Sequence, residues 1–294
     1  MEFPELWAGL AAELPKALCA YRARIASLYV QEKPDRTLLT EADLAIEQMI
    51  ISMISDRDPD AKVLAEESGT GTWRPKTDEE PERIWVIDPI DGTAEFLRPD
   101  STDFCSVVCL LEHRRPVAAL VVAPELGTDS EPIVILASGS QQTITVNGKA
   151  AVYNSALAPA LAASLTRSSG TPTPHHELVL ADAGYTLKTR TTSQTLDMVR
   201  TAIDLPGIAH QPARFDIFYR SRQKIWDGLA GLCLGEISGL MSTDLDSQSQ
   251  LPVTLDTLSQ PEPTFASTVM GRPEAVTWFA ELARGSRTGA PRSS

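Results

Sequence analysis

Apolar residues recur at helical spacing in several stretches of the chain. From residue 5 to about 30, runs such as ALCAYRARIASLYV place an apolar side chain every three or four positions, which predicts a helix in two pieces joined at Pro15. The same spacing predicts further helices over residues 40–56, 193–203, 225–238 and 272–284.

Shorter apolar runs, bounded by turn-forming residues, predict strands. In the first half these are residues 62–65, 83–88, 104–111, 117–123, 131–137 and 143–147. In the second half they are residues 163–168, 178–183, 215–219 and 239–243. Residues 67–82 are rich in turn formers and charge and are predicted to be a loop. Because two helices precede a run of strands, the order favours α+β layering over a regular βαβ alternation.

The predicted elements divide the chain into two halves without an obvious linker. Residues 1–150 form the first α+β half, and residues 151–284 form the second. The final stretch, residues 285–294, is polar and contains Gly and Pro, which predicts a disordered tail.

Composition narrows the classes of partner. The formal net charge is −13 over 294 residues and no basic patch stands out, which argues against a nucleic acid polymer or an anionic membrane as partner. No apolar stretch approaches the roughly 18 residues of a membrane span. Glu2 and Glu5 stand where a signal peptide carries positive charge, so a cytoplasmic protein is expected. The four cysteines show no C-x-x-C spacing, which disfavours structural zinc.

The stretch VIDPIDGTAEF (residues 86–96) raises a question of charge, because Asp88 and Asp91 flank Pro89 directly after an apolar strand. A turn at the proline would bring both carboxylates towards one point, where they repel unless one is protonated or a cation lies between them. Mg²⁺ takes such oxygen ligands, including a backbone carbonyl such as that of Ile90. The alternative is a turn with two solvated aspartates.

Gly92 and Thr93 follow at once and offer backbone N–H groups to an anion. Three other acids stand in comparable places, and each also has a structural explanation. Glu66 ends a short strand in LAEESG, where charged exits are common, and Asp227 in KIWDGLAG suits the first turn of a helix. Asp43 in TEAD fits a capping box begun by a threonine.

Taken together and in this order, TEAD, AEES, DPIDGT and WDGLAG resemble the inositol monophosphatase-like superfamily of Mg²⁺-dependent, lithium-sensitive phosphatases. The resemblance runs from about Lys33 to Thr243. It implies a layered α/β/α/β/α sandwich, a small phosphorylated substrate, two or three Mg²⁺ ions per site and a possible homodimer.

The resemblance also implies a role for each matching residue. The first Mg²⁺ would be held by Glu66, Asp88 and the Ile90 carbonyl, and the second by Asp88, Asp91 and Asp227. The N–H groups of Gly92 and Thr93 would bind the phosphate. Thr93, hydrogen-bonded to Asp43, and Glu66 would orient and activate the attacking water.

Residues beyond the shared motifs bear on the substrate. Glu95-Phe96 is similar to the 3'(2'),5'-bisphosphate nucleotidase branch, although that branch's lysine is Ala94 here. The resemblance therefore implies a substrate such as adenosine 3',5'-bisphosphate, with an inositol or sugar phosphate as alternative. Ser193 is the nearest equivalent of a substrate-contacting serine. A second phosphate could meet Arg214, Arg220, Arg222 or Lys224, although these side chains also suit a solvent-facing surface.

Two other classes of function remain open from the sequence. One is a haloacid-dehalogenase-type phosphatase, which forms an aspartyl-phosphate, although its two aspartates stand two positions apart and these stand three apart. The other is a protein that binds phosphorylated ligands with Mg²⁺ and does not turn them over.

Overall fold

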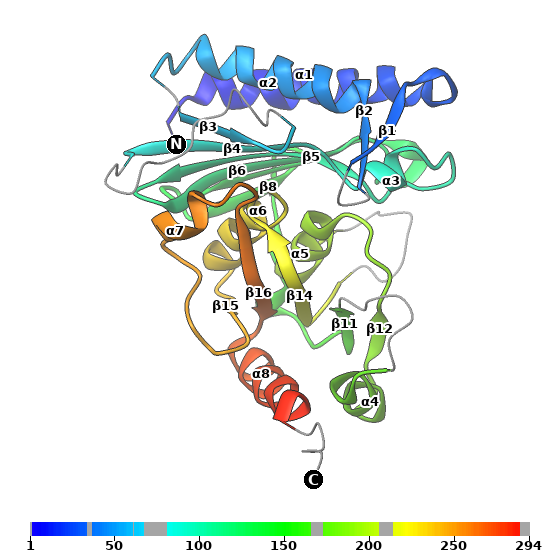
Figure 1. Cartoon of the computed structure of the whole chain (residues 1–294), viewed down its shortest axis with the longest axis vertical. Coiled ribbons are helices and arrows are strands. Elements are labelled where there is room, and N and C mark those ends of the chain that lie inside the picture. The colour runs from blue at the N-terminus through cyan, green and yellow to red at the C-terminus, as the bar shows by residue number, and fades with distance from the viewer. Residues whose placement is uncertain are drawn as a thin grey trace.

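Two β-sheets alternate with three layers of helices in the computed structural model of the chain (Figure 1). The structure describes residues 2–33, 37–60, 62–67, 81–165, 173–205 and 214–288. The outermost layer is the pair α1 (Pro4–Arg22) and α2 (Glu41–Ser55), which cover one face of the larger sheet. The predicted five-layer α/β/α/β/α sandwich is confirmed.

The larger sheet has seven strands in the order β3-β4-β5-β6-β7-β8-β9, and all neighbours are antiparallel except β3 and β4. Its strands are β3 (Lys62–Ala65), β4 (Arg83–Asp91), β5 (Cys105–Glu112), β6 (Arg115–Ala123), β7 (Ile133–Ser138), β8 (Thr143–Val146) and β9 (Lys149–Ala150). The turn at Asn147 and Gly148 has positive φ at both residues, as a tight hairpin between β8 and β9 requires.

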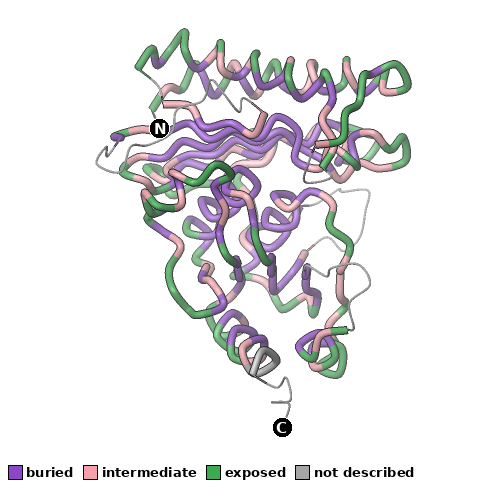
Figure 2. Tube along the Cα trace, in the orientation of Figure 1, coloured by how far each residue is buried: buried purple, intermediate pink, exposed green. Residues whose placement is uncertain are grey.

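Both faces of this sheet are buried, as the continuous purple of its central strands shows (Figure 2). Side chains along β4 alternate between two hydrophobic cores. Trp85 and Ile87 join the core beneath α1 and α2, whereas Ile84 and Val86 join the core on the opposite face. That second core is filled mainly by α5 (Gln194–Ala202) and α6 (Ile225–Ile237), which lie between the two sheets.

The smaller sheet has five strands in the order β12-β11-β14-β16-β15. These are β11 (Ala162–Leu165), β12 (Thr186–Lys188), β14 (Ile217–Lys224), β15 (Met241–Thr243) and β16 (Thr264–Gly271). Its far face packs against α4 (His175–Asp182) and α8 (Pro273–Thr288). The remaining elements are β1 (Val30–Glu32), β2 (Leu38–Thr40), α3 (Thr93–Phe96), β10 (Val152–Tyr153), β13 (Ile203–Asp204), α7 (Leu255–Leu258) and three single-turn helices at Ile25–Ser27, Thr128–Ser130 and Asn154–Ala156.

Three expectations are corrected. Residues 178–183 lie largely in α4 and are not a strand, because a short apolar run fits a buried helix as well as a strand. The first helix ends at Arg22 and contains Pro15 without a break. The last helix reaches Thr288, four residues into the predicted tail. Three predicted stretches lie outside the described residues: 289–294 of the tail, 68–80 of the loop and 166–168 of a strand.

Candidate active site

The Asp-Pro-Ile-Asp segment is not the turn that the sequence suggested but the end of β4, interrupted by a β-bulge. Asp88 pairs with Val107 of β5 and Asp91 pairs with Cys105, so three steps along β4 match two along β5. Pro89 has no N–H to give to the ladder, and proline within a sheet is confined to edges and bulges.

The bulge decides which way the two carboxylates point. In a regular strand, residues three apart face opposite sides of the sheet. One extra residue restores the match, so Asp88 and Asp91 lie on the same face as their partners Val107 and Cys105, towards α5 and α6. Ile90 packs into the opposite core. The motif therefore brings two acids together through strand geometry, where the sequence suggested a turn.

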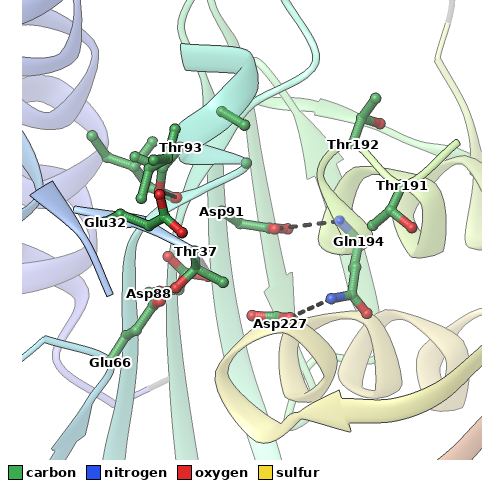
Figure 3. A pocket seen from close by; sticks show the side chains of 14 residues that line it. Glu32, Thr37, Glu66, Asp88, Asp91, Thr93, Thr191, Thr192, Gln194 and Asp227 are labelled. Atoms are coloured by element: carbon green, nitrogen blue, oxygen red, sulfur yellow. Dashed lines mark hydrogen bonds between the residues drawn. The ribbon is translucent and has the colours of Figure 1, made fainter. Parts of the chain in front are cut away.

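Asp227 comes to the same point from the first turn of α6. Carboxylate oxygens of Asp88, Asp91 and Asp227 lie within 4.8 Å of one another, and all three residues are buried. The acids line a cleft of about 480 Å³ together with Glu32, Thr37, Leu38, Glu66, Ile90, Gly92, Thr93, Ala94, Thr191, Thr192 and Gln194 (Figure 3).

Asp91 is held by the N-terminus of α5. Its Oδ2 accepts hydrogen bonds from Ser193 Oγ at 2.7 Å and from the Thr195 N–H at 2.7 Å, and its Oδ1 accepts a longer one from the Gln194 N–H at 3.3 Å. Ser193 is also the N-cap of α5 and is fully buried. The Ser193 hydroxyl thus donates to Asp91 and is not among the residues that line the cleft, and its contact with substrate stays a prediction.

Gln194 is the residue that the sequence analysis missed. Its side-chain Nε2 donates to Asp227 Oδ2 at 2.6 Å, so one residue contacts both Asp91 and Asp227 (Figure 3). The available signal was its place directly after the N-cap of an amphipathic helix that follows the acidic motif.

Glu66 lies at the exit of β3 on the opposite wall of the cleft (Figure 3). Its Oε1 accepts a hydrogen bond from Lys33 Nζ at 2.9 Å, and the same ammonium bonds Glu67 Oε1 at 2.7 Å. Burial and the charge of Glu66 raise the pKa of Glu67 to about 8. A lysine thus sits where a cation is needed to hold two neighbouring carboxylates together.

Asp43 and Thr93 lie within hydrogen-bonding distance, as the resemblance to the superfamily implies. Thr93 Oγ1 lies 3.3 Å from Asp43 Oδ1 and 3.1 Å from the Ile90 carbonyl, so its single proton has two possible acceptors. The other oxygen of Asp43 closes a capping box with the N–H and hydroxyl of Thr40. Burial raises the pKa of Asp43 to about 6.

The carboxylates raise one another's affinity for protons. Burial raises the pKa of Asp91 to about 6. The pKa values of Asp88 and Asp227 lie well above the ordinary range, first through burial and then through the charges of the neighbouring acids. Asp88 Oδ1 is buried without a hydrogen-bond partner. Clustered, dehydrated oxygen ligands with an orphaned carboxylate oxygen fit a hard divalent cation such as Mg²⁺.

The basic residues named as possible phosphate contacts do not line the cleft. Arg220 is buried and pairs with Asp197 at 2.7 Å, while Lys224 pairs with Glu262 on the surface. Arg214 donates to the Ala158 carbonyl. Glu95, which suggested a nucleotidase, is also buried outside the cleft, where it pairs with Arg190.

The fold and the acidic cleft place the chain among layered α/β proteins whose site suits oxygen-ligated metal ions. Two solved structures share this fold. Thermotoga maritima IMPase has a TM-score of 0.72 and 19% identity, with coverage of 98% of this chain and 99% of that one. An IMPase/NADP phosphatase complexed with NADP and Ca²⁺ has a TM-score of 0.72 and 18% identity, with coverage of 95% of this chain and 93% of that one. The model of the inositol monophosphatase family matches residues 8–274, and the chain belongs to this family.

Curated relatives match only part of the chain. The Escherichia coli K12 3'(2'),5'-bisphosphate nucleotidase CysQ is 34% identical over 95 residues, which are 32% of this chain and 37% of that protein. The histidinol-phosphatase of Streptomyces coelicolor is 36% identical over 120 residues, 40% of this chain and 42% of that protein. The chain therefore spans about two fifths of the length of these relatives.

Within the described residues, no helix is both long and apolar enough to cross a membrane.

Proposed function

We propose that the protein is a Mg²⁺-dependent phosphatase that hydrolyses a small phosphate monoester by attack of water. The observation that carries the proposal is the convergence of Asp88, Asp91 and Asp227 within 4.8 Å, next to the Thr93–Asp43 pair, in a member of the inositol monophosphatase family.

Each residue has a role that its position supports. Asp88, Asp91, Asp227, Glu66 and the Ile90 carbonyl would hold the two or three Mg²⁺ ions. When bound, Mg²⁺ supplies electrostatic stabilisation of the attacking, leaving and phosphoryl oxygens of an in-line displacement. The N–H groups of Gly92 and Thr93, which line the cleft, would bind the phosphate, as donors at the start of a helical turn can do.

The remaining residues handle the proton of the attacking water. Glu66 lies on the cleft wall and accepts that proton. Thr93 Oγ1 accepts a hydrogen bond from the water while it donates its own proton to Asp43. Thr93 can donate to Asp43 in this way only when Asp43 is ionised, so this arrangement operates above a pH of about 6.

Adenosine 3',5'-bisphosphate, a 3'(2'),5'-bisphosphate nucleotide, is the first candidate substrate. The CysQ relatives and the Glu95-Phe96 pair support it, although Glu95 itself is buried away from the cleft. Histidinol phosphate is the second, supported by the similarity to the Streptomyces enzyme over 120 residues. An inositol or other sugar phosphate remains the alternative that the family name supports.

Phosphate release from adenosine 3',5'-bisphosphate, histidinol phosphate and inositol 1-phosphate tests the proposal. With Mg²⁺ present we expect turnover of one of the three, inhibition by Li⁺ and no turnover after treatment with EDTA. Activity that survives complete metal removal would contradict the mechanism. A trapped phosphoryl group on Asp88 would favour the haloacid-dehalogenase type, and metal-dependent binding without release would favour a binding protein.

A further inference from the structure

Gln194 joins two of the acids through two different groups. Its backbone N–H lies 3.3 Å from Asp91 Oδ1, and its side-chain Nε2 lies 2.6 Å from Asp227 Oδ2. Asp91 comes from the larger sheet and Asp227 from α6, so Gln194, the first residue of α5, links acids on two other elements.

The chemistry of the amide matters for a cation site. A carboxylate oxygen accepts from Nε2 but would repel Oε1, so the orientation of the amide is fixed. An amide donor orients a carboxylate without bringing a positive charge that would compete with a metal ion. A lysine or arginine at this place would neutralise the site itself, in the way that Lys33 pairs with Glu66 and Glu67.

The bond also selects which oxygen of Asp227 is free. Gln194 bonds Oδ2, so Oδ1 is the oxygen that the amide leaves for a cation. The Asp227 backbone is fixed separately, because its carbonyl accepts from Thr195 Oγ1 at 2.9 Å. Loss of the amide would therefore release the carboxylate of Asp227 and leave its place in the fold unchanged.

We propose that Gln194 is a positioning residue that presets Asp227 for metal binding, so that its amide sets the metal affinity of the cleft. The inference rests on the proposed metal-dependent function and deepens it. Partners that orient metal ligands typically change metal affinity by about 10–100-fold when removed.

Tb³⁺ luminescence, with displacement by Mg²⁺, measures the affinity without turnover. Gln194→Met keeps the length of the side chain and removes the donor, and Gln194→Ala repeats the test if the methionine variant is unstable. Thr191→Val is the matched control, because Thr191 lines the same wall and, among the bonds of the described residues, none joins it to Asp91 or Asp227. Circular dichroism and the metal-free melting temperature report on folding.

We expect at least five-fold weaker binding of Tb³⁺ and Mg²⁺ in Gln194→Met, an unchanged affinity in Thr191→Val, and an unchanged fold in both. A smaller loss than five-fold, or an equal loss in the control, would overturn the positioning role while wild-type metal binding upholds the proposed function. If the wild-type protein itself binds neither ion, the proposed function fails and the inference fails with it.

Discussion

Replacing Asp91 by asparagine should abolish activity and, in the metal-free protein at neutral pH, increase stability. Asp91 is buried among other acids, and burial raises its pKa from 3.8 to about 6. Above that pH the folded protein must hold an ionised carboxylate that would be better solvated in the unfolded chain. Asparagine resembles the protonated acid in size and carries no charge.

The size of the effect follows from the pKa. Because the pKa of Asp91 is higher in the folded protein than in the unfolded chain, the folded state binds the proton more tightly. The free energy of unfolding is therefore highest below about pH 4 and falls as the pH rises through about 6. A pKa raised by about two units lowers the free energy of unfolding by roughly 3 kcal/mol once the carboxyl is ionised. Asparagine accepts fewer hydrogen bonds from Ser193 and Thr195, which reduces the gain in the free energy of unfolding by about 1 kcal/mol.

The net gain is then about 1–3 kcal/mol, or roughly 2–6 °C in melting temperature for a chain of this size. Thermal unfolding of the EDTA-treated proteins at pH 8 and at pH 4.5 measures it, with exposed Asp60→Asn as control. The gain should vanish at pH 4.5, and added Mg²⁺ at pH 8 should stabilise only the wild type and the control. A metal-free variant that melts below the wild type at pH 8 would refute the reasoning.

Three other substitutions test single features. Gly92→Ala should lower the free energy of unfolding by about 1–3 kcal/mol in denaturant titrations and reduce kcat, because φ is +93° and the new Cβ would lie 3.1 Å from the Asp103 carbonyl oxygen. Asp43→Asn should reduce kcat by about 100-fold or more and remove the rise of wild-type activity through about pH 6, as a pH–rate profile would show, because Thr93 loses an ionised acceptor. Arg22→Met should lower the melting temperature in thermal unfolding, because this buried guanidinium donates to four carbonyls between Phe96, the last residue of α3, and Ser101.

The sequence predicts most of the layers because the helices over 41–55 and 225–237 and the buried strands carry strong periodicity. It also predicts which acids meet, although through the wrong local geometry. The local sequence Asp-Pro-x-Asp predicts a turn, whereas in the structure β4 pairs with β5 on both sides of Pro89. Long-range pairing overrode the local preference, and a single sequence does not reveal the strand with which Asp91 pairs.

Contacts across the cleft could be predicted least. The motif predicts Ser193 as a substrate contact, but it does not predict that the Ser193 hydroxyl caps α5 and donates to Asp91. The position of Gln194 directly after a helix cap is a weak signal, because an amide there is common and gains meaning only through its bond to Asp227 of α6, 33 residues later.

The origin of the acids has a consequence for stability. Asp88 and Asp91 belong to the larger sheet, and Asp227 belongs to α6, which packs between the sheets. Without a cation the raised pKa values of Asp88 and Asp227 favour their protonated forms, whereas a bound ion would be held by carboxylates from both layers at once. Metal binding should therefore stabilise the junction between the sheet and α6 most. Hydrogen exchange of α6 amides with and without Mg²⁺ would show this as slower exchange, and protection confined to exposed loops would contradict it.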